Sequence, residues 1–107
     1  MPEEVHIFED ASGGLRVWPP FVFVHKVGGN VRWHNHTANL VEMRDLPLNV
    51  ILGVMMPHNI PAAGAGGVPG SIGPHGVDPA AARGTYKYHV FCPTTGKWAR
   101  GSEFAVD

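Results

Sequence analysis

The chain has 107 residues, of which 44% are hydrophobic and 16% charged, a size and composition that fit one domain with a modest core. Eight Lys and Arg residues against nine Asp and Glu residues give a formal net charge of -1. This balance provides no basic stripe for phosphates, and no apolar run is long enough for a spanning helix. We therefore expect a single domain over residues 1–107, without a nucleic-acid partner and without membrane insertion.

Cysteine usage and the N-terminus bear on the cellular compartment. The only cysteine is Cys92, so no intramolecular disulfide can form and packing must hold the fold. Residues 1–5 include two glutamates, and no apolar run of the kind found in signal peptides follows them. As written, the sequence predicts a cytoplasmic protein, and a periplasmic one if the chain is a processed form. It does not determine the oligomeric state.

The first forty residues predict short strands separated by Gly and Pro. Residues 5–8, 15–18 and 21–25 concentrate β-branched and aromatic side chains, which favour strands. The glycines of residues 27–30 predict a tight turn into a further strand that lies next to the one before it. The strand after the turn alternates between two faces: Val31, Trp33 and Asn35 on one, and Arg32, His34 and His36 on the other.

The middle of the chain is less regular. Residues 39–44 and 48–56 are each apolar enough for a strand, although the second run shows no period and also fits a buried helical turn. Residues 57–83 are dominated by Gly, Pro and Ala. This composition predicts a long irregular loop that either carries function or packs as a flap.

The last quarter again shows a strand pattern. Residues 84–92 place Tyr86, Tyr88, Val90 and Cys92 on one face, and two tyrosines at a period of two indicate a core face. A turn at residues 93–96 leads to a closing strand at 102–106. About seven short strands with little helical signal predict an all-β sandwich or barrel.

Two stretches resemble the cupredoxins, the small copper proteins that include plastocyanin, azurin and amicyanin. Residues 28–35, Gly-Gly-Asn-Val-Arg-Trp-His-Asn, are similar to the family's Gly-x-x-Val-x-Trp/Phe-x-Asn strand. Residues 83–88, Arg-Gly-Thr-Tyr-Lys-Tyr, are similar to its Pro-Gly-Thr-Tyr-x-Tyr/Phe strand, and Val-Pro-Gly at 68–70 resembles a turn between the two. The resemblance spans roughly two-thirds of the chain. It implies a Greek-key β-sandwich, copper-dependent electron transfer or copper handling, and a redox or protein partner.

The copper ligands that the resemblance implies are incomplete in this chain. A type 1 site uses an upstream His, a Cys thiolate, a second His and a weak axial ligand such as Met. The family's cysteine position corresponds to Val90, two residues before Cys92, and residues 93–98 contain neither His nor Met. The upstream His position falls at residue 38 or 39, where His36 is the nearest substitute. An ordinary type 1 copper centre is therefore not expected.

Other His, Cys and Met residues offer a rearranged site. His34 and His36 share a strand face at a spacing that chelates zinc or copper, unless both simply face water. His89 and Cys92 combine imidazole with thiolate, but residues three apart on a strand point to opposite faces, and a free Cys is often a buried small hydrophobe. We predict a metal site drawn from these four residues, with copper and no cofactor as equal alternatives. A second set, whose sulfur atoms favour reduced copper, consists of Met55, Met56, His58 and His75.

Two further functions remain open. The first is a metal-free β-sandwich interaction module in which residues 57–83 contact a partner. The second is a small cupin-type barrel: Gly28, His34, His36 and Glu42 approximate that family's first metal motif, and His75 after Pro-Gly at 69–70 approximates its second. The glutamate stands one residue too late, and residues 84–88 then have no explanation. Because no nucleophile motif, phosphate loop or carboxylate pair is present, enzymatic activity is not the leading expectation.

Overall fold

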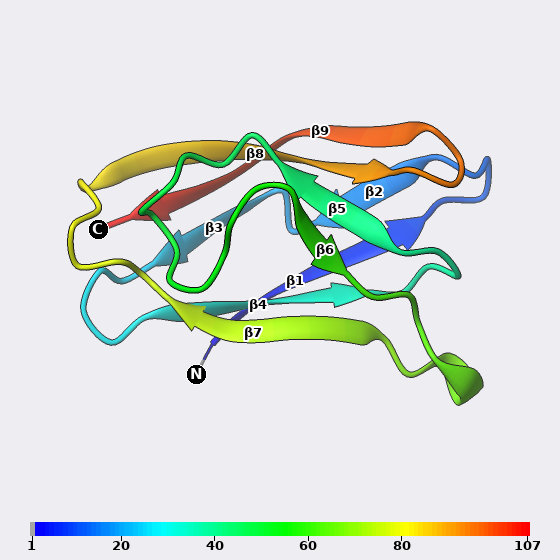
Figure 1. Cartoon of the computed structure of the whole chain (residues 1–107), viewed down its shortest axis with the longest axis horizontal. Helices are drawn as coiled ribbons and strands as arrows, with labels where there is room; N and C mark the ends of the chain where they lie inside the picture. Colours follow the sequence, from blue (N-terminus) through cyan, green and yellow to red (C-terminus); the bar gives the residue numbers. More distant parts are fainter. Residues whose placement is uncertain (1) are drawn as a thin grey trace.

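The computed structural model describes residues 2–107 as two β-sheets packed face to face (Figure 1). The predicted all-β sandwich is confirmed, with nine strands in the described residues instead of about seven. No helix in this part of the chain is long and apolar enough to cross a membrane. The elements are β1 (Glu3–Glu9), β2 (Leu15–Trp18), β3 (Phe21–Val24), β4 (Asn30–Asn35), β5 (Val41–Arg44), β6 (His58–Ile60), the 3-10 turn η1 (Ala65–Gly67), β7 (Gly70–Gly76), β8 (Gly84–Cys92) and β9 (Lys97–Val106).

Both sheets mix parallel and antiparallel pairs. The four-stranded sheet has the order β2-β1-β4-β7, and the five-stranded sheet has the order β3-β9-β8-β5-β6. β1 runs parallel to β4, and β3 runs parallel to β9. The parallel pairing of β1 with β4 sets outward side chains of the N-terminal strand beside those of the strand that contains His34.

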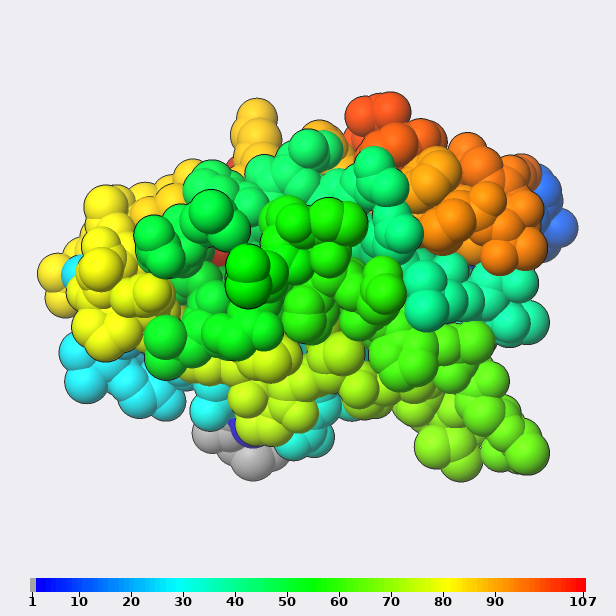
Figure 2. Space-filling model, viewed as in Figure 1, coloured from blue at the N-terminus to red at the C-terminus, as the bar shows by residue number. Residues whose placement is uncertain are grey.

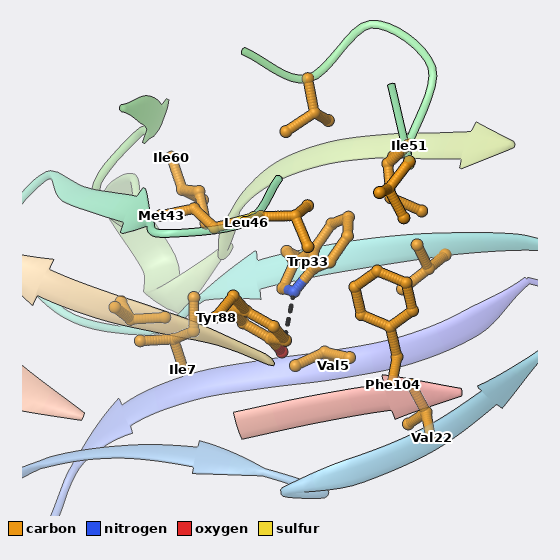
Figure 3. Close-up of a cluster of buried hydrophobic side chains, with 14 of the residues drawn as sticks. Val5, Ile7, Val22, Trp33, Met43, Leu46, Ile51, Ile60, Tyr88 and Phe104 are labelled. Atoms are coloured by element: carbon orange, nitrogen blue, oxygen red, sulfur yellow. Dashed lines mark hydrogen bonds between the residues drawn. The ribbon is translucent and has the colours of Figure 1, made fainter. Parts of the chain in front are cut away.

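The core lies between the sheets and is built around three large, fully buried side chains, Trp33, Tyr88 and Phe104 (Figure 3). The Trp33 Nε1–H donates a hydrogen bond of 3.2 Å to the Tyr88 hydroxyl, so the two sheets are joined by a polar contact inside the core. Burial raises the pKa of Tyr88 to about 12, which keeps the hydroxyl neutral. The inward faces predicted for residues 31–35 and for Tyr88, Val90 and Cys92 are confirmed.

The turn at residues 27–30 does not form the hairpin that its glycines predicted. β3 lies in the five-stranded sheet and β4 in the four-stranded sheet, so the turn carries the chain from one layer to the other. Val24 and Val31 both face the core, from opposite sides of it. Turn residues permit a reversal of the chain, but the burial of both apolar faces decides which strands pair.

The strand predicted at residues 48–56 is wrong. Only Ile51 forms a bridge there, with Val77, and the rest of the run is irregular. Asn49 and Gly53 have positive φ angles of 62° and 78°, which interrupt an extended backbone. The run is apolar because Val50, Ile51 and Val54 cover the core from a loop.

The Gly- and Pro-rich stretch at 57–83 is not one continuous loop. It contains β6 and β7, each at the edge of a sheet, where a strand tolerates a proline such as Pro74. β7 begins at Gly70, where a Cβ atom would lie 1.9 Å from the Pro61 carbonyl oxygen, so only glycine permits the approach. The irregular parts are residues 77–83 and residues 61–69, and the latter project from the sandwich at the lower right of Figures 1 and 2.

Candidate functional site

Aromatic and polar side chains form a row across the outer face of the four-stranded sheet. The strand registers pair Trp18 with His6, His6 with His34, and His34 with Ser71. Directly opposed side chains on one sheet face lie close enough to interact. The row therefore brings together residues from β2, β1, β4 and β7, which are far apart in the sequence.

Three imidazoles gather along this row, and we call His6, His34 and His36 the outer histidine cluster. The ring centroid of His6 lies 5.1 Å from that of His34 and 5.1 Å from that of His36. The His34 and His36 centroids are 6.4 Å apart. A hydrogen bond of 2.9 Å joins His6 Nδ1 to His36 Nε2, so one ring donates its N–H to the lone pair of the other. The His34 and His36 pair predicted from the sequence is thus present, together with a third imidazole.

Both ring nitrogens of His34 already have partners. Its Nδ1 lies 2.7 Å from the Ser71 hydroxyl oxygen, and its Nε2 contacts the Glu4 carboxylate. The hydrogen bond with His34 is the main cause that lowers the pKa of Glu4, and the Arg32 guanidinium, 3.8 Å from the carboxylate, adds to it. His34 is therefore held in place as a support, and the nitrogens that face each other belong to His6 and His36.

The charge state of His6 suits a ligand. Burial is the first cause that lowers its pKa, and the neighbouring His34 and His36 lower it further. A lower pKa keeps the ring neutral at neutral pH, and a metal ion binds only the neutral imidazole.

Cys92 lies away from the outer histidine cluster. It ends β8 on the same inward face as Tyr88 and Val90, and only 2% of its surface is exposed. Its sulfur packs into the core from the five-stranded sheet, whereas His36 follows β4 and is exposed beside His6. In this position Cys92 acts as a small hydrophobic side chain.

His89 lies on the outer face of the five-stranded sheet, opposite to Cys92, as strand parity predicts. Its Nδ1 accepts a hydrogen bond of 3.1 Å from the Gly101 N–H, and its Nε2 lies 3.9 Å from Asp45. The predicted set of His34, His36, His89 and Cys92 is therefore divided among two outer faces and the core. These residues do not fit a type 1 copper ion.

The described residues 2–107 contain no group of three or more His, Cys, Asp or Glu side chains arranged to hold a metal ion. The cupin-type set is divided as well, because Glu42 lies on β5 of the five-stranded sheet, where its carboxylate pairs with Arg44. Any metal site in this arrangement thus has fewer than three ligands from such side chains.

The second predicted set is also only partly assembled. Met55 is 72% exposed, while Met56 packs against the core. The rings of His58 and His75 meet edge to face, with centroids 5.9 Å apart. The structure thus brings together the two imidazoles of this set.

Sequence reasoning missed His6. Because Val5 and Ile7 are inward, the alternation of β1 does place Glu4 and His6 on its outer face. What the sequence does not give is the parallel register that sets His6 beside His34.

Comparison with protein-family models and with curated proteins finds no match.

Proposed function

We propose that this protein is a cupredoxin-like domain that binds a divalent transition metal, Cu²⁺ before others, through His6 and His36. Its role is then metal handling, with no type 1 copper centre. The observation that carries the proposal is the distance of 2.9 Å between His6 Nδ1 and His36 Nε2 on the outer face of the four-stranded sheet. The resemblance of residues 28–35 and 83–88 to cupredoxin strands supports the choice of family.

The nitrogen separation fits two adjacent ligands of one ion. Imidazole nitrogens bind zinc or copper at about 2.0 Å, so two nitrogens at a right angle around the ion lie about 2.8 Å apart. Right-angled positions are typical of tetragonal Cu²⁺, the divalent ion that binds nitrogen sites most tightly in the first-row series. To bind one ion, the donating ring must move its proton to its other nitrogen, and both rings must turn their lone pairs from each other toward the ion.

The exposure of the site favours exchange of the metal. His36 is exposed, and with two protein nitrogens the remaining coordination positions fall to water or to a donor on a partner. An open site of this kind accepts and releases an ion more readily than a closed one. His34, held by Glu4 and Ser71, supports His6 by stacking against it at an interplanar angle of 19°.

Trp18 provides a local test. It pairs directly with His6 and is 62% exposed, whereas Trp33 is buried and Trp98 lies on the other sheet. Bound Cu²⁺ quenches nearby indole fluorescence, so titration of protein purified without an affinity tag is expected to quench Trp18 saturably. The double variant His6→Gln/His36→Gln is expected to abolish this quenching.

The matched control is His25→Gln, which removes another exposed histidine that contacts a carboxylate, Asp107 at 2.8 Å. It should leave the quenching intact. Trp18→Phe should remove the optical signal while calorimetry still detects binding. Quenching that persists at full affinity in the His6→Gln/His36→Gln variant would exclude the site.

A metal-free interaction module is the second candidate function. Its support is the exposed aromatic group at the β2–β3 corner, where Trp18 is followed by Phe21 and Phe23, whose rings contact each other at 5.0 Å between centroids. If neither calorimetry nor Trp18 fluorescence detects Cu²⁺ at equimolar concentration, this second function becomes the leading one.

A further inference from the structure

We infer that His58 and His75 form a second metal site, a two-imidazole clasp for a divalent ion such as Zn²⁺ that joins the edges of the two sheets. This site is separate from the outer histidine cluster and does not depend on the function proposed above.

The two histidines come from different layers of the sandwich. His58 lies on β6, the edge strand of the five-stranded sheet, and pairs with Met43. His75 lies on β7, the edge strand of the four-stranded sheet, and pairs with Val31. β6 and β7 contact each other, yet they belong to different sheets and share no strand ladder (Figure 1). An ion held by both rings would therefore link the layers where the backbone does not.

The separation of the two rings fits one shared ion. An ion bound at about 2.0 Å from an imidazole nitrogen lies about 3.2 Å from the centroid of that ring. Two rings on the same ion then have centroids about 4.5 Å apart at a right angle and up to about 6.4 Å apart in line. The observed separation of 5.9 Å between His58 and His75 lies within this range. The rings now meet edge to face, so at least one side chain must rotate to turn its nitrogen toward the ion.

The surroundings partly shield both rings from solvent. Both histidines are half-buried. Burial, followed by the neighbouring His75, lowers the pKa of His58.

A glycine leaves the space that the His75 ring needs. A Cβ atom at Gly53 would lie 3.3 Å from the His75 Nδ1, which is tighter than an ordinary contact. Gly53 also has a φ angle of 78°, where glycine is favoured. The apolar run at 48–56 thus packs against the proposed clasp as well as covering the core.

The clasp exists only in the folded chain, because the two edges separate when the sandwich unfolds. An ion that binds the folded state alone raises the free energy of unfolding as its concentration exceeds the dissociation constant. At a hundredfold excess over that constant, a domain of this size gains about 10 °C in Tm. The ion should therefore act as a structural link between the sheets.

The test uses the His6→Gln/His36→Gln variant, in which the site of the proposed function is absent. Addition of Zn²⁺ is expected to raise its Tm by several degrees, and both the His58 and the His75 imidazole proton resonances should shift together. When His58→Gln or His75→Gln is added to the His6→Gln/His36→Gln variant, either substitution should abolish the rise in Tm. Adding His25→Gln instead should preserve it. A rise that survives either substitution, or zinc that moves neither resonance, would overturn the clasp.

The two proposals fail separately in this design. Loss of Trp18 quenching concerns only the outer histidine cluster, and the zinc response in the double variant concerns only His58 and His75. If one of the added substitutions prevents folding, the resonance shifts in the His6→Gln/His36→Gln variant still decide the matter.

Discussion

The outer faces of the two sheets both carry aromatic rings, but these rings make different contacts on each face. On the four-stranded sheet, His6 and His36 bring two ring nitrogens within 2.9 Å of each other. On the five-stranded sheet, the Phe91 and Trp98 rings lie 4.4 Å apart. The guanidinium groups of Arg44 and Arg100 stand over the Trp98 ring at 5.8 and 4.3 Å.

The outer face of the five-stranded sheet offers few free groups that could bind a metal ion. Arg44 is paired with Glu42, and the His89 Nδ1 is occupied by the Gly101 N–H. Cation and ring stabilise each other there, but neither offers a lone pair to a metal. Strand alternation puts histidines outward on both sheets, and the neighbouring strands decide which of them can act as ligands.

The largest expected effect tests this contrast directly. His36→Gln removes one of two protein ligands, so chelation is lost and the Cu²⁺ affinity reported by Trp18 should fall at least about a hundredfold, or about 2.7 kcal/mol. His89→Gln, the matched change on the other sheet, should leave the affinity within about twofold. Equal losses in the two variants would remove the distinction between the faces.

A smaller effect is expected from the contact that joins the two sheets. Tyr88→Phe leaves the buried Trp33 Nε1–H without its acceptor, so the free energy of unfolding should fall by about 1–2 kcal/mol in urea denaturation. Cu²⁺ quenching of Trp18 should be unchanged, because the outer histidine cluster is not in the core. A change in quenching without a loss of stability would contradict this separation.

The face of the five-stranded sheet should depend only weakly on its arginines. Arg100→Ala removes an exposed guanidinium from the Trp98 ring, which should lower the free energy of unfolding by about 0.5 kcal/mol and alter Trp98 emission. The control Lys87→Ala removes an exposed cation that is not stacked on Trp98, and it should leave that emission unchanged. An emission change of the same size in both variants would argue against the stacking.

The smallest effect is confined to acid and concerns the turn between β1 and β2. Hydrogen bonds from Ser12, Arg16 and Gly14 hold the pKa of Asp10 well below its usual range. The folded pKa lies below the unfolded value, so this stabilisation is present above about pH 4 and is lost as the pH falls further. In a plot of Tm against pH, Asp10→Asn should reduce the fall in Tm at acidic pH. A variant in the turn at 93–96, such as Thr95→Ala, should show the same fall as the unmodified protein.

Much of the fold could be read from the sequence. The alternation in residues 31–35 and 84–92 identified the inward faces, including Trp33 and Tyr88, because side-chain direction in a strand follows a local period of two. The partition of His89 from Cys92 follows from the same rule. Residues 48–56 were misassigned because an unbroken apolar run has no period that distinguishes a strand from a buried loop.

Which strands pair with each other could be seen only in the tertiary structure. His6 meets His36 across 30 residues, and His58 meets His75 across the edges of two sheets. These contacts depend on which strands pair and in what register. The register is set by the joint burial of many apolar side chains rather than by any local pattern. The sequence by itself determined which side chains face outward. Only the tertiary structure decided which of those side chains lie close enough to share an ion.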